Sequence, residues 1–167
     1  FKWLEKNFYK LIKLDDKILE KAILKSIEIK LFYVKKDPKE NLINHNSRAM
    51  LNFGHTIGHS LETLYKYHNK LNHGEAVSIG MITEAIISNK LKYLSDNHLN
   101  LIINHFNKSD LKIFDKNISN KKIIYNIMKD KKNSNGKVNI VLLRGIGKSF
   151  FARKIIIDDL IKILKKI

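Results

Sequence analysis

The sequence predicts a mainly α fold, a multihelical domain that carries one small β-hairpin. Apolar residues recur at a spacing close to 3.6 through most of the chain, which is typical of helices. β-branched residues form only one short strand-like run, near the C-terminal end. With 167 residues the chain is long enough to bury one core, so we expect a single domain over residues 1–167.

The first helix is expected from about Asp15 to Val34, where apolar residues follow the helical spacing. The only proline, Pro38, ends this helix and opens a polar, asparagine-rich loop. A second helix is expected from about Met50 to Tyr67. A third runs from about Gly74 toward Leu94, and its small apolar residues indicate a central, buried helix. A shorter helix follows near Leu99–Phe106.

The C-terminal part of the chain predicts one more helix, the hairpin and a closing helix. Lys121–Lys129 has helical spacing, and Val138–Leu143 is the β-branched run. Ser149–Arg153 can pair with that run across the turn Gly145–Gly147. The terminal helix is expected over Ile157–Lys166.

Composition limits the classes of protein to which the chain can belong. The formal net charge is +16, but lysines are scattered through every segment, so the charge does not by itself predict nucleic-acid binding. No apolar run approaches the roughly 20 residues that cross a bilayer, and we expect no membrane partner. With no cysteine, a metal site would use N and O ligands. This fits a cytoplasmic protein, and the start at Phe1 suggests a fragment.

Residues 48–59, with the sequence RAMLNFGHTIGH, and the LNHGEAV stretch that follows hold the strongest functional signal. His55 and His59 are four residues apart, so on a helix they share one face. His73 stands where the next helix begins. Imidazoles that converge from these positions make a candidate site for a divalent metal, although the pair could be a coincidence. Glycine inside a helix is costly, so Gly54 and Gly58 indicate close approach of a ligand or of another helix.

Polar residues upstream of the histidines are candidates for binding an anionic substrate. Arg48 and Asn52 lie four residues apart, and a guanidinium fork beside an amide suits a carboxylate or a hydroxyl-rich molecule. Taken alone, each is typical of an ordinary surface residue. Glu75 lies in the first turn of the third helix, where the helix dipole stabilises a carboxylate, so we expect it to have this role rather than to bind metal.

Together these stretches resemble the C-terminal domain of 3-dehydroquinate synthase. The match consists of the 48–62 segment with its two histidines and Glu62, the HGEAV run, and Gly80-Met81. It continues upstream through Glu28-Ile-Lys30 and Glu40, and downstream through Asp130-Lys-Lys132.

The resemblance implies a catalytic zinc or cobalt ion held by His55 and His73, with a third glutamate ligand that would precede Phe1. It implies proton transfer by His59 and Glu40. It implies that the substrate is bound by Lys30, Arg48, Asn52, Lys131 and Lys132. Because the loop between Glu40 and Arg48 is longer than the family pattern, the position of Glu40 is the weakest part of this match.

The implied reaction converts 3-deoxy-arabino-heptulosonate 7-phosphate to 3-dehydroquinate and phosphate, a lyase step of the shikimate pathway toward chorismate and aromatic amino acids. NAD would bind mainly to an N-terminal nucleotide-binding domain that this chain lacks. The chain alone would then be incomplete, working with the N-terminal half and as a homodimer when complete. Two alternatives stay open, a metal-dependent glycerol or alcohol dehydrogenase-like domain and an eroded, non-catalytic basic binding module.

Overall fold

The chain forms two compact units, Phe1–Leu51 and Asn52–Ile167. The computed structural model describes residues 1–65, 71–129 and 135–167. Each unit is described by itself below. The expectation of a single domain over the whole chain stays a prediction.

The first unit is built from two helices. Helix α1 (Lys2–Ile12) lies in a stretch where no helix was predicted, and α2 (Asp16–Lys36) agrees with the helix predicted over Asp15–Val34. Asp15 caps α2, because its side chain accepts a hydrogen bond from the Ile18 N–H. No residue of either helix is buried, although α2 is rich in isoleucine and leucine.

A loop follows α2 and is held together by one buried carboxylate. Asp37 is 3% exposed and accepts hydrogen bonds from the backbone N–H groups of Asn41 at 2.8 Å and Arg48 at 3.0 Å. These bonds tie the start of the loop to its end. Within it, Glu40 is half-buried and has a positive φ of 53°, a conformation that non-glycine residues adopt rarely.

The histidine segment leads into the second unit, and here the predicted helix start at Met50 is wrong. Arg48–Asn52 is a 3₁₀ turn, η1, and the α-helix α3 starts only at His55 and is described to Tyr65. Gly54 separates them with a φ of +87°, which an α-helix cannot contain. The predicted end of the helix, at Tyr67, lies outside the described residues.

Helices α3 and α4 (His73–Lys90) cross with their backbones nearly in contact. A Cβ on Gly80 would overlap the carbonyl oxygen of Gly54, and a Cβ on Gly58 would lie 3.0 Å from the Ala76 carbonyl oxygen. The glycines therefore serve close packing of two helices, which was one of the two interpretations of Gly54 and Gly58.

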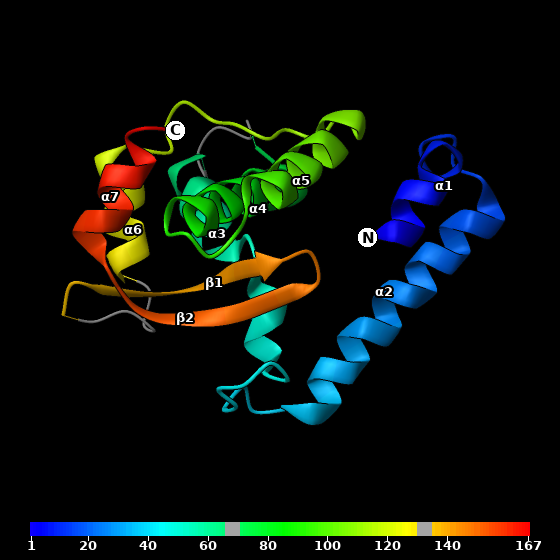
Figure 1. The fold of residues 1–167 in the computed structure, drawn as a ribbon, viewed down its shortest axis with the longest axis horizontal. Coiled ribbons are helices and arrows are strands. Elements are labelled where there is room, and N and C mark those ends of the chain that lie inside the picture. The colour runs from blue at the N-terminus through cyan, green and yellow to red at the C-terminus, as the bar shows by residue number, and fades with distance from the viewer. Residues whose placement is uncertain (66–70, 130–134) are drawn as a thin grey trace. The chain divides into compact units, whose positions relative to one another are not determined.

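The rest of the second unit surrounds α4 (Figure 1). Its elements are α5 (Asp96–Lys108), α6 (Lys121–Lys129), β1 (Lys137–Gly145), β2 (Lys148–Ile156) and α7 (Ile157–Leu164). The two strands pair antiparallel, with Val141 opposite Phe151, and turn at Ile146-Gly147 as predicted. In Figure 1 this hairpin runs beside α3 and α4, and β1 packs on α4.

Helix α4 is the centre of the core, as its small apolar residues predicted. Ala76, Ile79, Ala85 and Ile87 are completely buried. The predicted class, a mainly α fold with one small hairpin, is confirmed in the described part of the chain. Among the described helices, none combines the length and apolar character that crossing a membrane requires.

Candidate metal centre

Three histidines converge in the second unit from the starts of two helices. His55 and His59 lie one turn apart on α3, and their ring centroids are 5.2 Å apart. His73 opens α4, and its centroid lies 5.7 Å from that of His55 and 5.9 Å from that of His59. The structure therefore brings all three predicted histidines into one cluster.

The start of α4 is fixed by a capping box, which places His73. The Asn72 side chain accepts a hydrogen bond from the Glu75 N–H at 2.8 Å, and the Glu75 carboxylate accepts one from the Asn72 N–H at 3.0 Å. Glu75 also lies 2.6 Å from the Lys112 ammonium. The Glu75 carboxylate is thus bonded to the Asn72 N–H and to Lys112. Its position in the first turn of α4 agrees with the prediction from the sequence.

The spacing of the rings fits ligation of one divalent ion. With Zn–N distances of about 2.0–2.1 Å and tetrahedral angles, the centroids of two ligating imidazoles lie about 5 Å apart. All three observed separations are near this value. Glu62 adds an oxygen donor, since ligand atoms of His59, Glu62 and His73 lie within 4.8 Å of one another. The donor set therefore suits a borderline metal such as zinc or cobalt.

Burial favours the neutral form of His55, which is the form that binds a metal. Its Nδ1 lies 3.3 Å from the Phe53 carbonyl oxygen, which can only accept a hydrogen bond. Burial lowers the pKa of His55 below its usual value, and the neighbouring His59 and His73 act in the same direction, against the raising effects of the Phe53 hydrogen bond and of Glu62. A neutral ring with its proton on Nδ1 leaves Nε2 free to face the cluster.

A small cavity joins the histidines to the hairpin. It has a volume of about 120 Å³, and its lining residues are Asn52, His55, Thr56, His59, Asn139, Val141 and Phe151. The predicted substrate residue Asn52 therefore shares a cavity with two of the histidines. Asn139 and Phe151 were not foreseen, because nothing in a strand sequence shows which distant helix its side chains will face.

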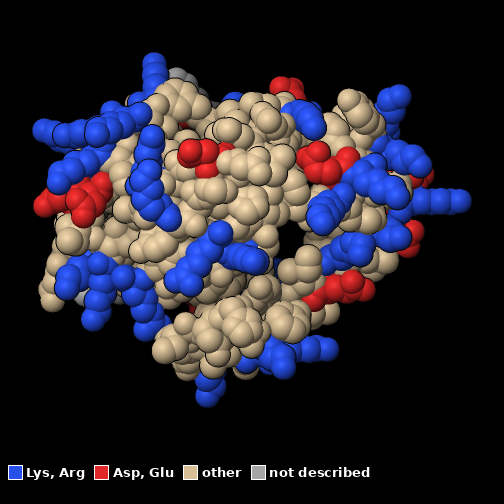
Figure 2. All heavy atoms as spheres, viewed as in Figure 1, with Lys and Arg blue, Asp and Glu red and all other residues tan. Residues whose placement is uncertain are grey.

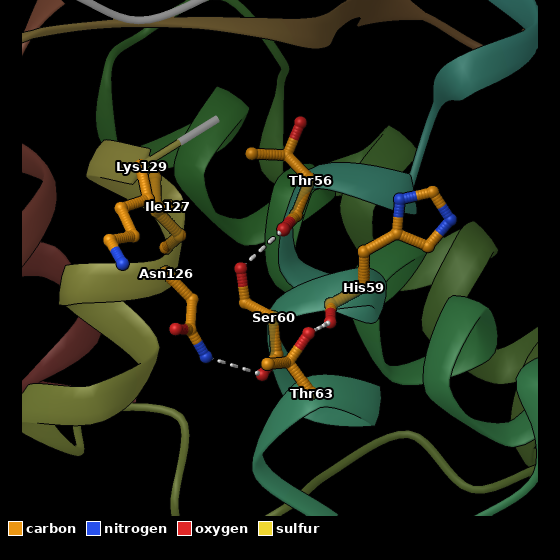
Figure 3. Close-up of a pocket in the computed structure, with 7 residues that line it drawn as sticks. All are labelled: Thr56, His59, Ser60, Thr63, Asn126, Ile127 and Lys129. Carbon is orange, nitrogen blue, oxygen red and sulfur yellow. Dashed lines mark hydrogen bonds between the residues drawn. The ribbon is translucent and has the colours of Figure 1, made fainter. Parts of the chain in front are cut away.

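A second cavity, of about 320 Å³, lies between α3 and α6 (Figure 3). Figure 3 shows Ser60 hydrogen-bonded to the Thr56 carbonyl, Thr63 to the His59 carbonyl, and Asn126 to the Ser60 carbonyl. In this view the His59 ring points away from Asn126. The hydroxyls of Ser60 and Thr63 donate within α3, and His59 is the member of the histidine cluster that lines this cavity.

The buried carboxylate of Glu84, which was not predicted, stabilises the start of the helix that carries His55 and His59. Glu84 is completely buried on α4 and accepts hydrogen bonds from the Gly54 N–H at 2.6 Å and the Ile57 N–H at 3.4 Å. It thereby satisfies free N–H groups at the start of α3. Burial raises the pKa of Glu84 to about 8, against the lowering effect of these hydrogen bonds. The sequence did contain a signal for this residue, because an acidic residue in an otherwise apolar, buried helix needs a hydrogen-bond partner.

The other predicted site residues are less directly described. Lys30, Glu40 and Arg48 belong to the first unit, where the Arg48 guanidinium donates a hydrogen bond to the Pro38 carbonyl oxygen at 3.3 Å. The positions of these three residues relative to the histidines stay a prediction. Lys131 and Lys132 lie outside the described residues.

Comparison with known proteins identifies the family. The family model described as 3-dehydroquinate synthase C-terminal matches residues 1–133, most of the chain. This chain belongs to the 3-dehydroquinate synthase C-terminal family.

Curated relatives of this family agree along the whole chain. A 3-dehydroquinate synthase from Thermodesulfovibrio yellowstonii is 39% identical over 167 residues, covering 99% of this chain and 45% of the relative. One from Buchnera aphidicola is 40% identical over 148 residues, covering 88% of this chain and 40% of the relative. The chain thus spans less than half the length of these relatives.

Solved structures of two synthases share the fold of this chain. A 2-epi-5-epi-valiolone synthase from Streptomyces hygroscopicus, solved with NAD⁺ and Zn²⁺, matches with a TM-score of 0.81 and 19% identity. That match covers 99% of this chain and 45% of the synthase. A 2-deoxy-scyllo-inosose synthase, solved with NAD⁺, Co²⁺ and carbaglucose-6-phosphate, matches 71% of this chain and 35% of its own, with a TM-score of 0.58 and 21% identity. At these identities the likeness concerns the fold.

Proposed function

We propose that this chain is the metal- and substrate-binding part of a 3-dehydroquinate synthase. The proposed reaction converts 3-deoxy-arabino-heptulosonate 7-phosphate to 3-dehydroquinate and phosphate. The observation that carries the proposal is the convergence of His55, His59 and His73 in a chain of this family. The relatives that carry the synthase name, one of them 41% identical, support this reaction over that of other cyclases.

We assign the metal, zinc or cobalt, to His55 and His73. A divalent ion bound there would polarise the reacting carbonyl or hydroxyl, and NAD would carry the hydride. His59 would move protons, because its imidazole lies one turn from His55 and beside the same cavity. Glu40 is assigned the second proton-transfer position.

The substrate is assigned to residues that hold anions and hydroxyls. These residues are Lys30, Arg48, Asn52, Lys131 and Lys132. Guanidinium and ammonium groups would neutralise the carboxylate and the phosphate, and the Asn52 amide would bind a hydroxyl in the cavity beside His55 and His59. By holding one substrate in register, such an array lets a single site run several steps.

The dehydrogenase-like alternative is less well supported. A neutral polyol does not require a guanidinium and two lysines, whereas a phosphorylated sugar acid does. An eroded, non-catalytic module is also disfavoured, because the three histidines keep a spacing that fits metal ligation.

We further propose that an N-terminal half supplies the NAD site and the third metal ligand, that the complete enzyme is a homodimer, and that it works in the cytoplasm. The shared fold with synthases solved with NAD⁺ and a divalent metal supports the cofactor assignment.

A fusion protein tests this function. The N-terminal part of the Thermodesulfovibrio yellowstonii relative would be joined to this chain and assayed for phosphate release with NAD, Co²⁺ and the heptulosonate phosphate. We expect turnover by the fusion, none by the chain alone, and none by a His55→Ala fusion. Phosphate release by the chain alone above its His55→Ala variant would refute the claim that it is incomplete. A folded fusion without turnover would refute the proposed function.

A further inference from the structure

We infer that Glu62 is a positioning residue that sets the tautomer and the orientation of His73. Glu62 lies on α3, seven residues after His55 and therefore on the same helical face. Its Oε1 is 3.0 Å from Nδ1 of His73. The inference rests on the proposed metal site and adds to it a residue that would touch neither the metal nor the substrate.

The contact fixes which nitrogen of His73 is available. An ionised carboxylate only accepts hydrogen bonds, so Nδ1 carries the proton, and in the neutral ring Nε2 then keeps its lone pair. Metal-binding histidines commonly donate their second N–H to a carboxylate or carbonyl in this way, which orients the ring and makes it a better ligand. The His73 side chain is 60% exposed and makes ring contacts with His55 and His59, so Glu62 is its one hydrogen-bond partner among the described residues.

The three histidines differ in this respect, in agreement with their proposed functions. Nδ1 of His73 is held by Glu62, and Nδ1 of His55 by the Phe53 carbonyl. Within the described part of the chain, the His59 ring makes ring contacts but no hydrogen bond. The two proposed ligands are thus fixed with Nε2 free, whereas the proposed proton carrier keeps both nitrogens available.

Glu62 could instead bind the metal itself, since its carboxylate belongs to the group of donors within 4.8 Å of one another. The substitution Glu62→Gln separates these cases. The amide oxygen that it introduces can still accept the proton of Nδ1, but a neutral amide is a poor ligand for zinc or cobalt. Glu62→Ala removes both possibilities.

Calorimetric titration of Co²⁺ into the chain provides the first measurement. We expect Glu62→Ala to weaken binding about 10–100-fold and Glu62→Gln to weaken it clearly less. The matched control is Glu75→Gln, which changes the charge of another carboxylate near His73, one that is bonded to Lys112. It should alter the affinity less than about 3-fold, a change of about 0.6 kcal/mol.

The tautomer can be read without metal. Long-range ¹H–¹⁵N spectra of the labelled, metal-free chain should show the proton of His73 on Nδ1 in the wild type and in Glu62→Gln. In Glu62→Ala it should shift largely to Nε2. An unchanged tautomer in Glu62→Ala, or equal loss of Co²⁺ affinity in Glu62→Gln and Glu62→Ala with a changed visible Co²⁺ spectrum, would overturn the inference.

The experiment also separates this inference from the proposed function. If His55→Ala leaves Co²⁺ affinity unchanged, the metal assignment fails while the tautomer measurement still decides the position of Glu62. If His55→Ala abolishes binding but Glu62→Ala does not weaken it, the metal assignment holds and the inference about Glu62 fails.

Discussion

At the scale of single residues, hydrogen bonds and burial explain how similar side chains acquire different properties. Burial lowers the pKa of His55 although the hydrogen bond to the Phe53 carbonyl raises it, and burial raises the pKa of Glu84. Glu75 experiences the opposite effect, since the hydrogen bond from Lys112 lowers its pKa. The surroundings of each side chain, rather than its residue type, therefore decide the direction in which its pKa shifts.

We predict that His59→Ala, in the fusion enzyme, lowers kcat much more than it lowers metal content. General acid–base groups contribute about 10²–10⁴-fold to the rate, whereas the proposed ligands His55 and His73 would remain. Turnover and metal per chain, measured by atomic absorption on the same sample, check this. If the metal disappears together with the activity, His59 is a ligand and the assignment of the proton carrier is wrong.

We predict that Glu84 makes the protein less stable as the pH rises through about 8. Its pKa is near 4.5 when unfolded and about 8 when folded, so the folded state holds an extra proton between these values. The stabilisation is complete below pH 4.5 and is lost as the pH rises through about 8.

Urea unfolding of the wild type and Glu84→Gln at about pH 6.5 and about pH 9 measures this effect. The wild type should lose on the order of 1–3 kcal/mol more than the variant over this range. Parallel losses in both proteins would show that Glu84 does not titrate in this window.

At the scale of elements, the α3–α4 crossing brings the three histidines together. His55 and His59 come from one helix, His73 from the other, and Gly54, Gly58 and Gly80 set how closely the helices approach. The hairpin then closes one side of the cavity with Asn139 and Phe151.

We predict that Gly80→Ala destabilises the protein by about 1–3 kcal/mol and weakens Co²⁺ binding. The added methyl group would overlap the Gly54 carbonyl oxygen and push the helices apart, which outweighs the roughly 1 kcal/mol gain in helix propensity. Gly74→Ala is the matched control in the same helix, because its nearest neighbour would be 3.5 Å away. Thermal unfolding measures the stability of the two variants, and Co²⁺ titration measures their metal affinity. Equal stability of the two variants would show that the crossing tolerates a wider separation.

At the scale of the whole molecule, the two units differ in how they are stabilised and both carry positive charge. Figure 2 shows lysine and arginine side chains spread over the face in view, with acidic groups between them. This distribution agrees with the scatter of lysines along the sequence, by which the charge of +16 does not by itself predict nucleic-acid binding. The absence of nucleic-acid binding stays a prediction.

We predict that α2 opens much more readily than α4 in the isolated chain. None of the residues of α2 is buried, whereas Ala76, Ile79, Ala85 and Ile87 of α4 are fully enclosed. Hydrogen exchange measured by mass spectrometry should show protection of α4 near the global stability and fast exchange along α2. Comparable protection of both helices would contradict this.

The sequence by itself determined the helical class, the hairpin, the central position of α4 and the histidine motif that indicates the family. These features depend on local periodicity and on residues close together in the chain. It also correctly placed Glu75 at the start of α4. It missed α1, and it began the second helix at Met50 because periodicity continues through η1 and does not register the positive φ of Gly54.

The tertiary structure decided what depends on residues that are far apart in the chain. Only folding joins Glu84 to the start of α3, Glu62 to His73, and Asn139 to the cavity beside His55. The physical reason is that hydrogen-bond partners and burial are set by the helix crossing, where glycines let two backbones meet. The residue pattern of one helix does not show where the other helix will cross it.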